Sequence, residues 1–264
     1  MNFLQLEIRR FKLLFMNKKI YHFLGPIIII AIWVAITRFN LVSPLFVSSP
    51  LAVLKEMFNS FLNDNLLLDI LYTFYRVAIG FMIAIIIGTP IGLLMGYSNK
   101  VYHSLEFVVE FFRSIPVTAL FPLFLLIFGI GDESKIAVTA WAAGLIIIVN
   151  SMYGVHLGKE LRIKVARSMK VTGFQLFSKV IFPEALPQII SGYRVAISLS
   201  LVIVVVTEMF IGTNHGLGHR IIDAQLVYRI PDMYSSILIT GILGYLLNKI
   251  LIISEKRIVH WKGK

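Results

Sequence analysis

The stretch VAIGFMIAIIIGTPIGLLMGYSN, residues 77–99, contains no Lys, Arg, Asp or Glu, and no run of this chain without these residues is longer. A bilayer core about 30 Å thick needs roughly 20 apolar residues in a helix, and this run has that length. Five further apolar stretches come close to this length: 20–37, 114–131 (beginning a turn or two earlier, near Phe107), 136–155, 187–212 and 233–254. The sequence therefore predicts an all-α membrane protein with six transmembrane helices.

The composition supports a lipid environment. The 264 residues are 58% hydrophobic and only 15% charged, with a mean hydropathy of +0.84, whereas about a quarter of the residues of an ordinary soluble domain are charged. The net charge of +11 does not indicate nucleic acid, because the cations fall mostly between the apolar runs. We expect the lipid bilayer, and no nucleic acid, as a partner. Cysteine is absent, which excludes disulfides and thiolate sites.

The distribution of Lys and Arg predicts the orientation. With a cytoplasmic N-terminus, the inner segments 1–19, 98–106, 157–186 and 249–264 hold seventeen cations, whereas the outer segments hold six. This excess satisfies the positive-inside rule, so both termini are expected in the cytoplasm. The first apolar run lacks a convincing small-residue cleavage site, which favours an uncleaved first span over a signal peptide.

Four segments follow from this topology. Residues 1–19 are expected to form a cytoplasmic interfacial segment, and residues 20–75 the first transmembrane helix with an amphipathic outer helix over 49–62, entered at Pro50. Residues 76–254 are expected to form the core, with a cytoplasmic segment at 160–187. Residues 255–264 complete the chain as a cytoplasmic tail.

Small residues recur every fourth position in the second span, at Ala84, Gly88, Gly92 and Gly96. This spacing places them on one helix face, where another backbone can approach closely. We expect a helix-packing face whose partner is either in the same chain or in a second copy.

Glu208 is the one carboxylate well inside a predicted span. Because a charge at mid-bilayer is costly, its side chain must face protein or water. It is either a residue of a translocation path or the partner of a cation. Arg113 and Arg194, near the cytoplasmic ends of their helices, are further path candidates, or extend their side chains to lipid headgroups.

Other site patterns are weak. His215, His219 and Asp223 have the spacing of metal ligands on a helix, but Gly216 and Gly218 favour a loop there, so no metal site is expected. No GxxxxGK[ST] phosphate loop and no serine nucleophile elbow occurs. We expect no catalytic residue, no cofactor and no ATPase activity in this chain.

One polar segment, ARSMKVTGFQLFSKVIFPEALP at 166–187, interrupts the apolar runs. Apolar residues recur at helical spacing on both sides of Gly173, and Pro183 and Pro187 close the segment. The pattern predicts two short helices joined by a turn, lying on the cytoplasmic face and shaped to contact another protein.

This segment resembles the EAA loop of ABC importer permeases. Val180, Ile181, Phe182 and Pro183 match the end of that motif, and Ala166 matches its second alanine. Lys170 stands at the glycine position of the motif, and Gly173 is expected to supply the flexibility of the turn.

Four further stretches are similar to the nitrate, sulfonate and taurine branch of that family. They are RSIPVTALFPLFLLIFGIGDESK at 113–135, GYRVA at 192–196, TEMFIGTNHGLG at 207–218 and EKR with HW over 255–261. The resemblance extends over residues 76–261.

The resemblance implies a type I ABC importer permease fold in the plasma membrane of a bacterium or archaeon. It further implies two cytoplasmic ATPase subunits that carry ATP and Mg²⁺ and grip the loop, an extracytoplasmic solute-binding protein, and a second permease copy, either identical or a paralogue. The solute would be small and anionic.

Two other function classes remain open from the residues alone. An ion-driven secondary carrier would want internal inverted repeats and several intramembrane acidic residues, whereas this chain shows one glutamate and no repeat. A membrane enzyme would use His215, His219 and Asp223, but no nucleophile and base are recognisable together.

Overall fold

The computed structural model describes residues 18–156 and 160–259, and these form helices connected by short loops. They divide into two compact units. Unit 1 comprises the described residues up to Asp64 together with 224–235, and unit 2 comprises 65–223 and the described residues from 236. The predicted N-terminal interfacial segment falls mainly on residues 1–17, which lie outside the described part.

Unit 1 contains α2 (Lys18–Arg38), α3 (Pro50–Asn63) and the start of α12 (Ile230–Ile258). α3 begins at Pro50 as predicted, and the Ser49 hydroxyl caps it by accepting from Ala52 N at 3.3 Å. Trp33 Nε1 donates to Ser48 O at 2.9 Å, and the Trp33 ring stacks on Tyr234 of α12. These contacts join α2 to the loop before α3 and to α12.

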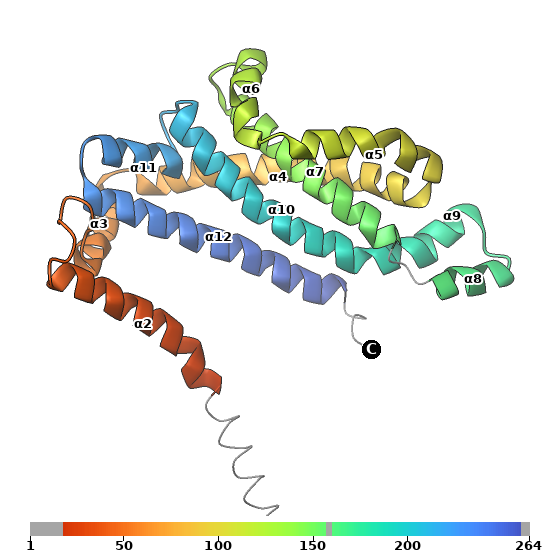
Figure 1. Ribbon diagram of the computed structural model, residues 1–264, viewed down its shortest axis with the longest axis horizontal. Helices are drawn as coiled ribbons and strands as arrows, with labels where there is room; N and C mark the ends of the chain where they lie inside the picture. The colour runs from red at the N-terminus through yellow and green to blue at the C-terminus, as the bar shows by residue number, and fades with distance from the viewer. Residues whose placement is uncertain (1–17, 157–159, 260–264) are drawn as a thin grey trace, which may run out of the picture. The chain divides into compact units, whose positions relative to one another are not determined.

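Unit 2 is built on three long helices, α4 (Leu66–Tyr97), α7 (Asp132–His156) and α10 (Phe182–Phe210). α7 lies alongside both α4 and α10 (Figure 1). The unit also holds most of α11 (Leu217–Leu226) and of α12 (Ile230–Ile258). α4 begins eleven residues before the predicted span, because the amphipathic turns that start at Leu66 bury one face.

The small-residue face of α4 packs on α7 of the same chain. A Cβ added at Gly88 would lie 2.9 Å from Gly144 O, one at Gly92 would overlap Ile148 O, and one at Gly96 would lie 2.6 Å from Val155 Cβ. Ala84, one turn before Gly88, is buried. The missing side chains therefore allow the two backbones to approach more closely than larger residues would permit.

The predicted third span is not one straight helix. α5 (Asn99–Ser114) ends before Pro116, a 3₁₀ turn follows over Val117–Leu120, and α6 (Phe121–Phe128) leaves at 92° to α5. The residue before a proline disfavours helical dihedrals, and Ile115 is extended, with φ −80° and ψ 125°. The pair is a broken span or a re-entrant loop, and residues 98–106, predicted as an inner loop, belong largely to α5.

Four helical stretches of the described chain are long and apolar enough to span a bilayer: 66–97, 132–156, 173–210 and 230–258. The bent α5–α6 pair would make a fifth. The described apolar part of α2, 23–38, is shorter than a full span. Six spans and cytoplasmic termini therefore stay predictions, whereas the all-helical membrane architecture is established.

Candidate functional site

The polar segment folds as two helices joined by a turn. α8 (Glu160–Ser168) and α9 (Gly173–Leu176) are separated by residues 169–172, and a π-helical turn over Phe177–Ile181 joins α9 to α10. Pro183 and Pro187 do not close the segment, because Pro183 lies in the first turn of α10, where no N–H is required, and the helix continues through Pro187. The second half of the segment is thus continuous with a membrane helix.

Two residues with positive φ make the turn. Lys170 has φ 61°, in the left-handed region that glycine adopts most easily, and Gly173 has φ 58°. Lys170, at the glycine position of the motif, therefore adopts a backbone conformation that glycine favours, at a steric cost of about 1–2 kcal/mol. The turn uses both positions, not Gly173 alone.

The segment has its own small core. Ala166 is 7% exposed and packs with Leu176 and Ile181, together with Val155, Ala185 and Ile189 of the flanking helices. Arg162 of α8 also pairs with Glu184 of α10 at 3.1 Å. α8 is therefore attached to the start of a membrane helix by apolar packing and by an ion pair.

On the face of the segment that points away from its core, apolar side chains are exposed. Val165, Met169 and Phe174 are 51%, 72% and 80% exposed. Beside them lies a groove of ≈ 580 Å³ lined by Arg162, Val165, Ala166, Met169, Lys179, Val180, Pro183 and Glu184. The structure thus brings Ala166, Val180 and Pro183 together in one groove, with Lys170 and Gly173 in the adjoining turn and half-buried Phe182 beside it. We call residues 160–187 the coupling segment, after the role that the resemblance implies.

Glu208 lies in a buried ion network. Arg76 of α4, 1% exposed, donates from Nη1 to Glu208 Oε1 at 2.6 Å and from Nε to Asp132 Oδ1 at 2.8 Å. Glu208 itself is fully buried and accepts from Thr73 Oγ1 at 2.9 Å. One arginine therefore connects α4, α7 and α10 at one end of the three-helix core.

The same network holds the beginning of α11. Three successive backbone N–H groups bond to side chains at 2.9 Å each: Gly216 N to Asp69 Oδ1, Leu217 N to Thr73 Oγ1 and Gly218 N to Glu208 Oε2. These N–H groups would otherwise lack acceptors at the helix start. Glu208 thus acts as the buried partner of a cation and of a helix start, the structural alternative that the sequence left open.

The other two arginine candidates lie apart from this network. Arg113, half-exposed on α5, pairs with Glu110 one turn earlier at 2.5 Å. Arg194 of α10 lies 3.4 Å from Glu255 of α12, with its Nε near Asn248 Oδ1. The structure therefore places Arg113, Arg194 and Glu208 in three separate contacts, and their role in a translocation path stays a prediction.

The histidine pattern does not form a metal site. His219 and Asp223 pair on α11 at 3.1 Å, whereas His215 lies in the preceding loop, stacked on Tyr72 and 3.7 Å from Asp69. Among the described residues, no group of three His, Cys, Asp or Glu side chains could hold a metal ion.

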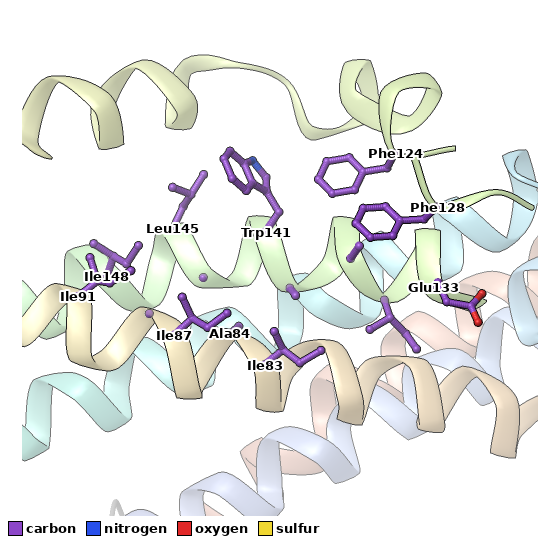
Figure 2. A pocket seen from close by; sticks show the side chains of 15 residues that line it. Ile83, Ala84, Ile87, Ile91, Phe124, Phe128, Glu133, Trp141, Leu145 and Ile148 are labelled. Atoms are coloured by element: carbon purple, nitrogen blue, oxygen red, sulfur yellow. The ribbon is translucent and has the colours of Figure 1, made fainter. Parts of the chain in front are cut away.

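An apolar cavity of ≈ 580 Å³ lies between α4, α6 and α7. Figure 2 shows Ile83, Ile87 and Ile91 of α4 on one side, with Trp141 of α7 and Phe124 of α6 on the other. Glu133 is the one charged side chain in the lining. This cavity offers a small anion no cationic partner, so it is a poor candidate for an anion site.

Comparisons with known proteins agree with this architecture. Residues 88–262 match the family described as "Binding-protein-dependent transport system inner membrane component". The chain is 30% identical to the "Putative aliphatic sulfonates transport permease protein SsuC" of Bacillus subtilis, over 90% of this chain and 86% of that protein. It is 31% identical to the nitrate import permease protein NrtB of a Synechocystis species, over 82% of each chain.

One relative and one solved structure complete the comparison. The taurine transport system permease protein TauC of Escherichia coli is 27% identical over 90% of this chain and 88% of its own length. A structure of the MetNI methionine ABC transporter in an inward-facing conformation has the same fold, with a TM-score of 0.64 and 22% identity over 75% of this chain and 96% of that one. The chain belongs to the binding-protein-dependent inner membrane components, the permease subunits of ABC importers, in the nitrate, sulfonate and taurine branch.

Proposed function

We propose that this chain is the subunit that forms the membrane path of an ATP-driven importer for a small anionic solute. Two copies, or this chain and a paralogue, would form the path, and an external binding protein would deliver the solute. Two cytoplasmic ATPase subunits, carrying ATP and Mg²⁺, would dock on the coupling segment. Relatives named for sulfonates, taurine and nitrate support the solute class.

The observation that carries this proposal is the construction of the coupling segment. α8 is attached by the Ala166 packing and the Arg162–Glu184 pair to the start of α10, the helix that also holds Glu208. A push on α8 or α9 therefore acts directly on a membrane helix. Exposed Met169 and Phe174 offer apolar anchors for a partner, and the surrounding cations suit an acidic rim.

The docking role is tested by placing a charge on the exposed apolar side. Phe174→Glu should leave the fold intact, because Phe174 is 80% exposed, and should weaken binding of the ATPase subunit about thirtyfold, the factor for a hot-spot residue worth about 2 kcal/mol. Gln175→Glu is the matched control, since it adds the same charge one residue away and removes no apolar contact. Co-purification of the ATPase subunit and ATP-dependent uptake in proteoliposomes are the measurements. Normal uptake by Phe174→Glu would refute docking at this site.

Ala166 is a less suitable test position, because its side chain lies in the core of the segment. A bulky or acidic substitution there would disrupt α8 packing and docking together. The exposed positions separate these two effects.

The orientation can be tested with single cysteines, because the chain contains none. In right-side-out membrane vesicles, an impermeant maleimide should label Lys55→Cys of α3 and should not label Gln175→Cys of α9. The reverse pattern would place the coupling segment outside the cell and would refute the ATP-driven mechanism.

A further inference from the structure

A second cavity, of ≈ 590 Å³, has a polar lining that distinguishes it from the apolar cavity of Figure 2. It lies at the end of unit 2 where α4, the start of α7 and the loop before α11 meet. Its charged and polar lining residues are Tyr72, Arg76, Asp132, Lys135, Thr213, Asn214 and His215.

Lys135 is a cation of this cavity whose ammonium group has N–H donors without a hydrogen-bond acceptor among the described residues. The residue is 1% exposed, and its Nζ donates to Gly131 O at 2.9 Å. An ammonium group has three N–H donors, and within the described part of the chain Lys135 makes this one hydrogen bond and no ion pair. A buried ammonium group with free donors is costly unless another acceptor reaches it.

The other cation of the cavity, Arg76, already has an acceptor for each of its N–H donors. The five N–H donors of Arg76 are taken by Asp132 Oδ1 at Nε and Nη2, by Glu208 and the His215 carbonyl at Nη1, and by Thr213 Oγ1 at Nη2. An incoming ligand would therefore find its donors on Lys135.

The remaining groups around the cavity permit an anion. Asp132 is a carboxylate whose side chain is 32% exposed, and Arg76 balances its charge through two contacts to Oδ1. Glu208 is fully buried beneath the arginine, and the His215 ring stacks on Tyr72. Asn214 is exposed at the rim, where its carboxamide can donate to a bound ligand.

We infer that Lys135, with Asn214 at the rim, forms a binding subsite for a small oxyanion, the sulfonate, nitrate or carboxylate group of a solute. A volume of ≈ 590 Å³ is ample for nitrate or a short alkyl sulfonate. This inference rests on the proposed function and assigns the anion selectivity to named residues. The competing explanation is that Lys135 has only a structural role: Arg76 binds two carboxylates, Asp132 and Glu208, and Lys135 would supply the second positive charge.

Thermal unfolding of the full chain in lipid nanodiscs distinguishes an anion-binding role of Lys135 from a purely structural one. Sodium ethanesulfonate and sodium nitrate replace sodium chloride at fixed ionic strength, and tetramethylammonium chloride serves as the cation probe. A ligand that binds only the folded protein raises the unfolding temperature with its concentration, which gives the Kd. We expect both oxyanions to raise this temperature and tetramethylammonium to leave it unchanged.

Three variants locate the site. Lys135→Met should raise the Kd for ethanesulfonate at least about tenfold, because hydrogen bonds to charged groups have at least that effect. Asn214→Asp, at an exposed position that should not disturb folding, should also raise the Kd by placing a negative charge at the rim. Lys100→Met, which removes an exposed lysine at the start of α5, is the control and should behave as the wild type.

A purely structural role of Lys135 would change the unfolding temperature without ligand and leave the Kd unchanged, which would overturn the inference. Absence of any anion effect on the wild type, or stabilisation by tetramethylammonium, would also overturn it. If Lys135→Met does not fold, an unaltered Kd for Asn214→Asp has the same consequence. ATP-dependent uptake by the wild-type importer would still support the proposed function in each case, so the two failures are distinguishable.

Discussion

Arg76 Nη1 lies 2.6 Å from Glu208 Oε1, although 132 residues separate the two in the chain. Both side chains are buried, and Asp132 of a third helix lies 2.7 Å from Nη2 of the same guanidinium group. Removing one member of such a group leaves buried charge without a partner, which costs more than the pair itself contributes.

Arg76→Met should therefore be strongly destabilising, by about 3–5 kcal/mol, because it leaves the buried Glu208 and the partly buried Asp132 without their shared cation. Glu208→Gln should cost less, since Asp132 still neutralises the arginine and the amide oxygen can still accept from Gly218 N. Unfolding of the purified protein in mixed micelles measures both. An Arg76→Met variant as stable as the wild type would contradict this account of the network.

Arg194 offers a contrast on the same helix. Its side chain is 38% exposed and lies 3.4 Å from Glu255. Solvent screens this pair, so Arg194→Met should cost less than about 1 kcal/mol, and the cost should fall further as salt is raised. The same micelle titration at two salt concentrations is the measurement, and a salt-independent loss of several kcal/mol would show a role beyond this pair.

The α4–α7 contact gives a prediction with an internal control. Gly92→Ala should destabilise the protein by about 1–3 kcal/mol, the range for overpacking, because the added Cβ overlaps Ile148 O. Gly144→Ala adds the same atom on α7, where nothing lies within 4 Å. It should be neutral or slightly stabilising, since alanine favours helix over glycine. Equal effects of the two substitutions would rule out a close backbone contact at Gly92.

The turn of the coupling segment gives another prediction. Lys170→Gly should relieve about 1 kcal/mol of backbone strain at φ 61°, and Lys170→Val should disrupt the turn, because a β-branched residue resists that conformation. Hydrogen exchange of the backbone amides over residues 165–175 reports the difference, with slower exchange expected for the glycine variant. Faster exchange in Lys170→Gly than in the wild type would contradict the strain.

The sequence predicted the elements whose determinants are local. The start of α3 follows from Ser49 and Pro50, which act on the backbone beside them. The apolar lengths of α4, α7 and α12 likewise depend on nothing beyond their own residues. The break between α5 and α6 had a local signal as well, in Pro116, but the apolar run across it masked that signal.

The buried network was beyond local reasoning. Arg76 borders the apolar run 77–99, and counting cations by loop assigned it to the outer side, although the structure buries it. The available signal was Glu208, since a carboxylate within a span requires a partner. Which of the cations approaches Glu208 depends on how the helices pack, and no spacing along the chain encodes that.

The seam of Gly88, Gly92 and Gly96 against α7 has a mechanical consequence. Two helices whose main chains touch at three successive glycines cannot slide or twist past each other without steric overlap. They must therefore move together as one rigid body. Any rocking of this subunit between its states then has to bend somewhere else. The 92° bend between α5 and α6 is a break in the helical hydrogen bonding where the chain can take up such bending.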